Sequence, residues 1–322
     1  MDNTSTPSNL PRLPLITSSL AAEALAPVTH IYTDLDGTLL APGGRLLTNH
    51  AGEPSSALAE ALVALKRAGI EVLIVTGRDA EQGNELLRIL DLNTFIGEIG
   101  TFRLDGFGAL GRTSYLLGDW EHTVLAADLA PGELPENMTP YELVEQSGVT
   151  ERLFARFPGR LEPHFFFRVR SRVTHALRGF VNVEEAEDFL AGERLPLTLL
   201  DNGIIQPQVH TLKDCPEIHV YHLAPRGASK AAAVAADIAQ RGLDAARTLA
   251  IGDAPGDMEM GRHTGSLVAV ANALRSAQVR EALAARLAAG RATFVTEAST
   301  ADGWLQFAHA LLAAKRTASA TG

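Results

Sequence analysis

The chain has 322 residues, 46% of them hydrophobic and 20% charged, and its formal net charge is -10 at pH 7. This length fits roughly two domains with buried cores, and no apolar run is long enough to cross a bilayer. The acidic balance disfavours a general nucleic-acid binder, whose surface would be basic. The single cysteine, Cys215, permits neither an internal disulfide nor a thiolate metal cluster, which predicts a reducing cytoplasm. We expect no nucleic acid, membrane or obligate protein partner.

Residues 1–27 are rich in Ser, Thr, Pro and Ala, which predicts a flexible N-terminal tail. A secretory signal needs a basic start and a continuous apolar centre. This segment instead begins with Asp2 and carries Glu23 within its apolar stretch, so an export signal is not expected.

Two carboxylates follow a strand-like run at residues 31–33, in the sequence D-L-D-G-T. Residues two apart on a strand point to the same side, so Asp34 and Asp36 are predicted to face one small space. Gly37 and Thr38 let the chain turn and offer backbone amides to an anion. An anion held among acidic side chains needs a cation, and a hard divalent ion with oxygen ligands suits this need. The alternative is an ordinary acidic turn after a strand.

Helix and strand patterns alternate after this motif. Residues 57–67 carry leucines in helical spacing, and residues 70–75 form an apolar strand. A further helix begins at Asp79, with Gln82 as its capping partner, and runs to about residue 90. Apolar strands joined by helices predict an α/β fold with a doubly wound, Rossmann-like parallel sheet. Ligands bind at the carboxyl ends of the strands in such sheets.

A second motif, Thr76-Gly77-Arg78, follows the strand at 70–75. The Thr76 hydroxyl can hydrogen-bond to a phosphate oxygen, and Gly77 permits close approach of the backbone. A plain turn explains the same three residues.

Between residues 105 and 217 the pattern changes, which indicates an inserted α+β domain. The basic face of one of its strands could bind a second anionic group or simply meet solvent. The histidines near its end could hydrogen-bond to a sugar or serve only the fold. The expected features are a short strand at 116–118, helices at 141–157 and 183–191, a hairpin in which Asp201-Asn202-Gly203 turns between 197–200 and 204–205, the face formed by His164, Phe166, Arg168, Arg170 and Arg172, and the two histidines His219 and His222.

The alternation resumes after residue 222, with a helix at 229–240 and strands at 248–251 and 267–270. Ser229 is predicted to cap the helix and Lys230 to open it, where both the lysine and the helix end could face an anion. The run from Gly252 to Asp257 places two spaced carboxylates after a strand. Asp253 can add a metal ligand there, and an acidic Pro-Gly turn is the alternative.

These four motifs, in this order on an alternating fold, resemble those of the haloacid dehalogenase superfamily of phosphatases. The chain is most similar to the Cof-type subgroup (family IIB), which includes sugar-phosphate, mannosylphosphoglycerate and sucrose-phosphate phosphatases. The resemblance implies a catalytic core over residues 28–104 and 218–315 and a C2-type cap over 105–217. Members often carry N-G-A where this chain has residues 98–101 as E-I-G-T, and S-x-N-D where it has residues 254–257 as A-P-G-D.

The resemblance also implies roles for residues of this chain. Asp34 would be the nucleophile that forms an aspartyl-phosphate, and Asp36 the general acid and base. The expected cofactor is Mg²⁺. The other implied residues are Asp34, the Asp36 carbonyl, Asp253 and Asp257 around the metal, Gly37, Thr38, Thr76, Gly77 and Lys230 around the phosphate, and Arg78 and Asn272 in contact with the substrate or in support.

The function expected from the sequence is a magnesium-dependent phosphomonoesterase acting on a small phosphorylated metabolite, most simply a sugar phosphate. A phosphotransferase or phosphomutase would instead pass the phosphoryl group to a sugar hydroxyl. A catalytically idle sensor would only bind a phosphorylated ligand. The presence of both Asp34 and Asp36 disfavours the sensor, since a binding protein has little use for a second acid and base.

Overall fold

The computed structural model describes residues 12–108, 111–121, 138–164, 171–205, 207 and 209–321. The chain divides into two compact units, one made of Met1–Val72 and Ile238–Gly322 and the other of Leu73–Asp237. Within the described ranges no helix is long and apolar enough to span a membrane.

The first unit is built on parallel strands in the order β12-β11-β10-β1. Nearly every residue of these strands is buried, as expected for a parallel sheet covered on both faces. Strand β2 begins beside them, where the Glu71 backbone N–H donates to the Thr29 carbonyl (2.9 Å). The strands are β1 (His30–Thr33), β2 (Glu71–Val75), β10 (Thr248–Gly252), β11 (Ser266–Ala269) and β12 (Ala292–Val295), and the helices are α1 (Ser19–Leu25), α2 (Ala57–Arg67), α9 (Pro255–Met260), α10 (Ala277–Ala288) and α11 (Thr300–Thr321).

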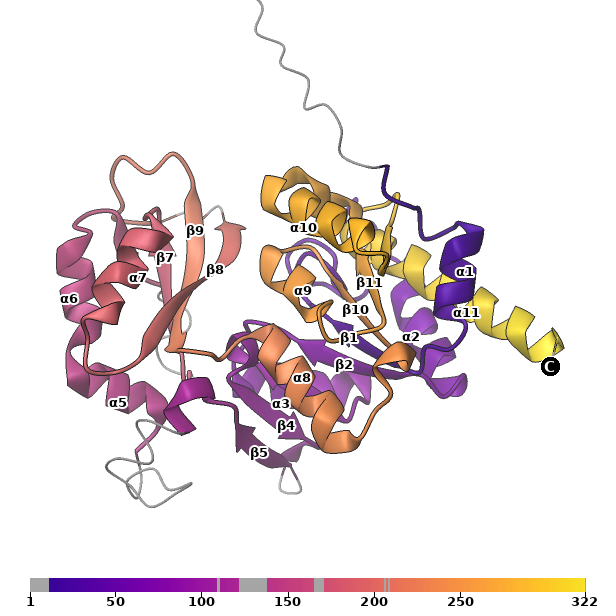
Figure 1. Cartoon of the computed structure of the whole chain (residues 1–322), viewed down its shortest axis with the longest axis horizontal. Helices are drawn as coiled ribbons and strands as arrows, with labels where there is room; N and C mark the ends of the chain where they lie inside the picture. The colour runs from indigo at the N-terminus through magenta and orange to yellow at the C-terminus, as the bar shows by residue number, and fades with distance from the viewer. Residues whose placement is uncertain are drawn as a thin grey trace, which may run out of the picture. The chain divides into compact units, whose positions relative to one another are not determined.

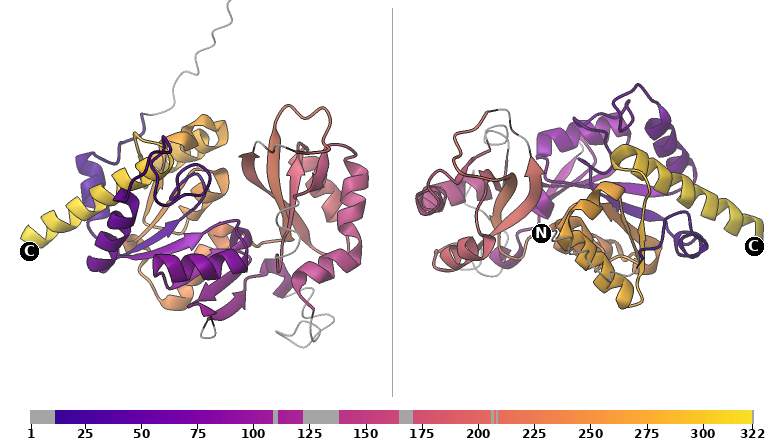
Figure 2. Two further views of the ribbon diagram at one scale, coloured as in Figure 1. Left: turned by 180° about the vertical axis from the view of Figure 1, so that it is seen from behind. Right: turned by 90° about the horizontal axis from the view of Figure 1, so that it is seen from above.

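The expected flexible tail is wrong for the residues just before β1. Ser18 caps helix α1, and Ala21 and Leu25 are fully buried. Leu15 forms a parallel bridge with Val295 of β12. Helix α1 lies alongside α11, so this part of the chain belongs to the packed unit (Figures 1 and 2).

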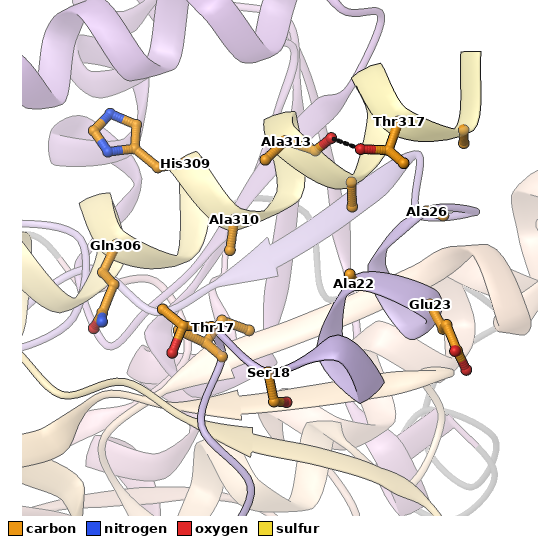
Figure 3. Close-up of a pocket in the computed structure, with 13 residues that line it drawn as sticks. Thr17, Ser18, Ala22, Glu23, Ala26, Gln306, His309, Ala310, Ala313 and Thr317 are labelled. Atoms are coloured by element: carbon orange, nitrogen blue, oxygen red, sulfur yellow. Dashed lines mark hydrogen bonds between the residues drawn. The ribbon is translucent and has the colours of Figure 1, made fainter. Parts of the chain in front are cut away.

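A cavity of about 560 Å³ lies between α1 and α11 (Figure 3). Alanines from both helices supply much of its lining, among them Ala22, Ala310 and Ala313. No residue of the four sequence motifs lines it. The cavity is therefore separate from the chemistry that the sequence predicts.

The second unit contains the rest of β2, which pairs with β3 (Thr94–Gly97) in parallel. Strands β4 (Phe102–Asp105) and β5 (Arg112–Tyr115) follow as antiparallel neighbours. Helix α3 (Ala80–Leu90) begins with the capping box of Asp79 and Gln82 that the sequence predicts. Helix α8 (Lys230–Arg241) starts in the same unit.

A separate antiparallel sheet with the order β6-β7-β9-β8 lies in this unit as well. Helices α5, α6 and α7 cover one face of it (Figures 1 and 2). Buried side chains from all three helices and from the sheet make one core, in which Trp120 and Leu153 are fully buried. This arrangement confirms an α/β core with an α+β insert. The elements are β6 (Leu161–Pro163), β7 (His175–Gly179), β8 (Leu197–Ile205), β9 (Ile218–Pro225), α5 (Pro140–Ser147), α6 (Val149–Arg156) and α7 (Val183–Ala191).

Three expectations for the insert need correction. The predicted hairpin is wrong, because β8 runs unbroken through Asn202 and the D-N-G signal produces a β-bulge between Asp201 and Ile204. The single helix expected at 141–157 is two helices, broken at Gly148, whose φ is 69°. The strand expected at 116–118 lies earlier, at β5. Of the predicted basic strand face, residues 165–170 lie outside the described residues.

Candidate active site

Asp34 follows the last residue of β1 and is held firmly by its backbone. Its N–H donates to the Ile251 carbonyl of the neighbouring strand (2.9 Å), and its carbonyl accepts from the Thr33 hydroxyl (2.7 Å). That hydroxyl in turn accepts from Trp304 Nε1 (3.0 Å), which is fully buried. The Asp34 side chain is only 5% exposed. A carboxylate thus stands at the carboxyl end of a buried strand, where the motif predicts it.

Asp36 differs from Asp34 in its surroundings. Strand β1 ends at Thr33, so the alternation of side chains along a strand does not extend to Asp36, whose side chain is exposed. The prediction that Asp34 and Asp36 face one space assumed that both lie on the strand. The structure does not support that assumption. An exposed carboxylate can exchange protons with solvent, whereas a buried one cannot do so readily.

The fourth motif begins where β10 ends, at Gly252. The Asp257 carboxylate is fully buried, and its Oδ2 accepts from the backbone N–H groups of Asp253 (3.0 Å) and Ala254 (2.9 Å). A Cβ atom at position 252 would lie 2.1 Å from the Asp257 Cβ, so only glycine fits there. Asp257 therefore fastens the loop that carries Asp253.

The carboxylates of Asp34, Asp253 and Asp257 come together. Each offers an oxygen within 4.8 Å of the others, and two of the three side chains are buried. Negative charges gathered away from water are costly unless a cation offsets them. Hard divalent ions such as Mg²⁺ prefer carboxylate and carbonyl oxygens. These three residues therefore fit a divalent cation.

The Asp253 side chain is held in place by Asn272 and by Gly37 and Thr38 of the first motif. The Thr38 hydroxyl donates to Asp253 Oδ1 (3.1 Å), and Asn272 Nδ2 donates to Asp253 Oδ2 (2.9 Å) and to the Gly37 carbonyl (3.0 Å). Asn272 Oδ1 accepts from the Thr300 N–H (2.8 Å), which fixes the orientation of the amide. A Cβ at Gly37 would lie 2.7 Å from Asp253 Oδ2, and φ is +85° there. Through these contacts Asn272 can support the loop that carries Asp253.

The substitution Asn272→Ala should weaken binding of Mg²⁺ to the free protein by about 10-fold to 100-fold, as loss of outer-shell partners typically does. The reason is that Asp253 loses a donor that orients it and Gly37 loses its tie to the same group. Titration calorimetry with MgCl₂ measures the effect. Asn49→Ala is the control, because Asn49 hydrogen-bonds to Glu53 in an exposed loop. Equal Mg²⁺ affinity in the two variants would contradict the positioning role.

In the second unit, the T-G-R motif is joined to the segment after β3. The Ile99 N–H donates to the Thr76 carbonyl (3.0 Å), and the Glu98 N–H donates to the Arg78 carbonyl (2.9 Å). Thr76 is buried, and its N–H donates to the Ile96 carbonyl (3.0 Å). The turn that carries the predicted phosphate ligands is therefore held by backbone bonds on both sides.

Lys230 lies beside the same segment. Ser229 caps α8 by accepting from the Ala232 N–H (3.1 Å), and Lys230 is the first helical residue, both as predicted. The Lys230 side chain is buried. A Cβ at Gly100, where φ is +93°, would lie 2.3 Å from the Ser229 carbonyl oxygen and 2.8 Å from the Lys230 nitrogen. The segment 98–100 thus contacts both the T-G-R turn and the start of α8.

Glu98 is the centre of a buried network that the sequence did not predict. Its Oε1 accepts from the Arg172 N–H (2.8 Å), and its Oε2 accepts from the Val173 N–H (3.0 Å). The same Oε2 accepts from the Thr174 N–H (2.8 Å) and from the Thr174 hydroxyl (3.2 Å). Burial raises the pKa of the Glu98 carboxyl, and these four donors oppose the rise. The one sign of this network in the sequence was that residues 98–101 read E-I-G-T where related proteins often carry N-G-A.

His222 extends this network. Its Nδ1 lies 3.1 Å from the Thr174 hydroxyl oxygen, and the side chain is buried. Burial lowers the pKa of His222 to about 3, and the positive charge of Lys230 acts in the same direction. The ring is therefore neutral near pH 7.

His222 should make the folded protein labile to acid. Its pKa is about 3 when folded against an ordinary 6.5, so the unfolded chain binds one more proton as the pH falls through this window. The free energy of unfolding should fall by up to about 1.4 kcal/mol per pH unit below about 6.5. Urea denaturation at about pH 7 and about pH 5.5 measures the slope. In His222→Gln, the slope of the unfolding free energy against pH should be smaller by up to about 1.4 kcal/mol per pH unit, because this variant lacks the proton that His222 binds on unfolding.

His219, on the same strand, provides the contrast. Its hydrogen bond to Asp201 raises its pKa, so its stabilising contribution is present at low pH and is lost as the pH rises. The substitution His219→Gln should therefore leave the protein more sensitive to acid, and an identical slope in both variants would contradict the assignment to His222.

The sequence matches the family model for haloacid dehalogenase-like hydrolases over residues 31–102 and 216–283. These segments contain all four motifs. Over these segments the chain is similar to the haloacid dehalogenase-like hydrolases, in agreement with the resemblance of its motifs. No curated protein sequence matches the chain at a significant level.

Several solved structures share the fold over nearly their whole length. Protein 0175 of Thermoplasma acidophilum is 17% identical, with a TM-score of 0.57, over 88% of this chain and 99% of that one. The sucrose-phosphatase of Synechocystis, solved with sucrose and phosphate, is 15% identical, with a TM-score of 0.52, over 87% and 97%. A putative HAD/COF-like hydrolase of Plasmodium vivax is 17% identical, with a TM-score of 0.53, over 92% and 99%. At these identities the likeness establishes the fold alone.

Proposed function

We propose that this protein is a magnesium-dependent phosphomonoesterase that hydrolyses a small phosphorylated metabolite of the sugar phosphate class. The observation that carries the proposal is the convergence of Asp34, Asp253 and Asp257 after two neighbouring parallel strands, in a chain similar to the haloacid dehalogenase-like hydrolases. A hard cation among these carboxylates, next to a D-x-D motif, suits phosphoryl transfer.

Asp34 is the proposed nucleophile, because its backbone is fixed and its buried carboxylate belongs to the acidic group. One of its oxygens forms a bond to phosphorus while the bond from phosphorus to the leaving oxygen breaks, which yields an aspartyl-phosphate. Asp36 gives a proton to the leaving alcohol. In the second step Asp36 takes a proton from water, whose oxygen attacks phosphorus, releasing phosphate and regenerating the Asp34 carboxylate. Exposure of Asp36 suits proton exchange with solvent.

Charge on the transferring oxygens must be offset for this reaction to be fast. A bound Mg²⁺ would supply much of that positive charge, and Lys230 is proposed to supply more. The proposed metal ligands are Asp34, the Asp36 carbonyl, Asp253 and Asp257, and the proposed phosphate ligands are Gly37, Thr38, Thr76, Gly77 and Lys230. Arg78 is proposed to contact the substrate or to support the phosphate ligands.

We propose a catalytic core and a cap, but with other boundaries than the 105 and 217 expected from the sequence. Strand β5 pairs with β4, and β9 pairs with β7 and β8 of the antiparallel sheet. The proposed core therefore takes residues 28–115 and 226–315, and the proposed cap takes 116–225. The core groups can recognise only phosphate and metal, so selection of the leaving group falls to residues of the cap. The α+β character of the insert supports this division.

The test is phosphate release from a panel of sugar phosphates, nucleotides and p-nitrophenyl phosphate, with and without Mg²⁺. Release that requires the metal, with one sugar phosphate preferred, would support the proposal. Transfer of phosphate to a second sugar instead of water would indicate a phosphotransferase or phosphomutase. Tight binding of a phosphorylated compound without any turnover would indicate a sensor and overturn the proposal.

A further inference from the structure

Two polar side chains of the second unit converge on Gly77, the glycine of the T-G-R motif. A Cβ atom at this position would lie 2.9 Å from Asn202 Nδ2, 3.2 Å from His222 Nε2 and 3.3 Å from Ile99 Cδ1. Asn202 comes from the bulge of β8 and His222 from β9. A donor and a ring nitrogen from the antiparallel sheet thus stand beside a backbone position that the sequence predicts to bind phosphate.

The hydrogen bonds among Glu98, Thr174 and His222 determine whether His222 Nε2 is a hydrogen-bond donor or acceptor. The Thr174 hydroxyl has one proton and donates it to the Glu98 carboxylate (3.2 Å). Its oxygen must then accept from His222 Nδ1, which lies 3.1 Å away and so carries the ring proton. Because the ring is neutral, Nε2 bears a lone pair and is a hydrogen-bond acceptor. Glu98 and Thr174 therefore select the tautomer of His222.

An acceptor on His222 and a donor on Asn202 suit one chemical group in particular. A hydroxyl can donate to Nε2 and accept from Nδ2 at the same time. A carboxylate or a phosphate dianion has no proton to give to Nε2, so a second anion is a poor match. An apolar group would take water away from both nitrogens without giving either of them a hydrogen-bond partner, which is costly.

We propose that Asn202 and His222 form a hydroxyl-recognition pair that selects the leaving group of the substrate. The substrate would be a phosphate ester of a sugar or other polyol, with a free hydroxyl near the ester. This inference rests on the proposed function and names the residues that choose the substrate class. Glu98 and Thr174 act as positioning residues, since they reach the substrate only through His222.

The histidine on the same strand does not share this environment. His219 Nδ1 lies 2.8 Å from the Asp201 carboxylate, its Nε2 lies 3.2 Å from Glu217, and both contacts are exposed. His219 stacks with Tyr221 at 5.8 Å between ring centroids. His219 thus has a local structural role, which makes it a matched control for His222.

The experiment compares the wild-type protein with Asn202→Ala, His222→Gln, Thr174→Val and the control His219→Gln. Each is assayed with the preferred sugar phosphate, with its deoxy analogues and with p-nitrophenyl phosphate, whose leaving group has no hydroxyl donor beside the ester. Thr174→Val retains the shape of the side chain, so it tests the relay even where His222→Gln fails to fold.

The proposal predicts a loss of about 10-fold to 100-fold in kcat/KM for the sugar phosphate in the first three variants. Release from p-nitrophenyl phosphate should stay within about twofold, and one deoxy analogue should be insensitive to the substitutions. Equal losses of kcat/KM on the sugar phosphate and on p-nitrophenyl phosphate, or no loss on either, would overturn the proposal that Asn202 and His222 recognise a hydroxyl. The phosphatase proposal would remain intact. A wild-type protein inactive on every compound would overturn both.

Discussion

The substitution Asp34→Asn is expected to abolish phosphate release while the protein stays folded. An amide of the same shape keeps the backbone bonds to Ile251 and Thr33 but is a far weaker nucleophile toward phosphorus. Residual kcat should lie at least about three orders of magnitude below that of the wild type. Rates are measured at saturating Mg²⁺ with the preferred panel substrate, and circular dichroism checks the fold.

Asp36→Asn gives a second and smaller expected loss, of about 10² to 10⁴ in kcat, because it removes the proposed acid and base but not the nucleophile. The loss should shrink for p-nitrophenyl phosphate, whose leaving group needs little protonation. Asp302→Asn is the control, since Asp302 accepts a hydrogen bond from His50 on the exposed surface. Appreciable turnover in Asp34→Asn, at more than a few per cent of the wild-type rate, would contradict the assigned role.

The largest expected effect on stability comes from Glu98→Ala. The substitution leaves three backbone N–H groups, at residues 172–174, and the Thr174 hydroxyl without their acceptor in a buried site. Each such group costs roughly 1–3 kcal/mol, and water entering the space left by the side chain offsets part of the sum. The free energy of unfolding should therefore fall by roughly 3 kcal/mol or more.

Urea denaturation at about pH 7 measures this change, and Glu85→Ala is the matched control. Glu85 also makes short hydrogen bonds, but to Arg88 on the exposed face of α3. A solvated ion pair contributes little to stability, so the control should shift the midpoint only slightly. Comparable midpoints in the two variants would mean that the Glu98 network does not hold the segment 172–174.

Local patterns predicted the elements that carry the site. Leucines in helical spacing gave α2 with its observed ends, and the Asp79–Gln82 pair marked the start of α3. The motifs worked because buried parallel strands must be apolar, so a polar residue that follows one stands out in the sequence. Asp34 and Asp253 were found in this way.

Such local patterns could not predict contacts between residues that are distant in the sequence. Glu98 accepts hydrogen bonds from residues 74 to 76 positions further along the chain, and nothing near it in the sequence marks that partnership. Asn202 was read as a turn residue, because D-N-G is the usual hairpin signal. Pairing with β9 overrides that preference and makes a bulge, which brings the Asn202 amide to Gly77. The exposure of Asp36 likewise depends on where β1 ends.

The proposed aspartyl-phosphate on Asp34 can be trapped and located directly. The protein is mixed with Mg²⁺ and its preferred substrate, quenched with acid, and treated with borohydride, which reduces an aspartyl-phosphate to homoserine. Peptide mass spectrometry then locates the modified residue. We expect modification at Asp34 and at no other aspartate. Rapid turnover with Asp34 unmodified, or with the modification at another residue, would contradict this expectation.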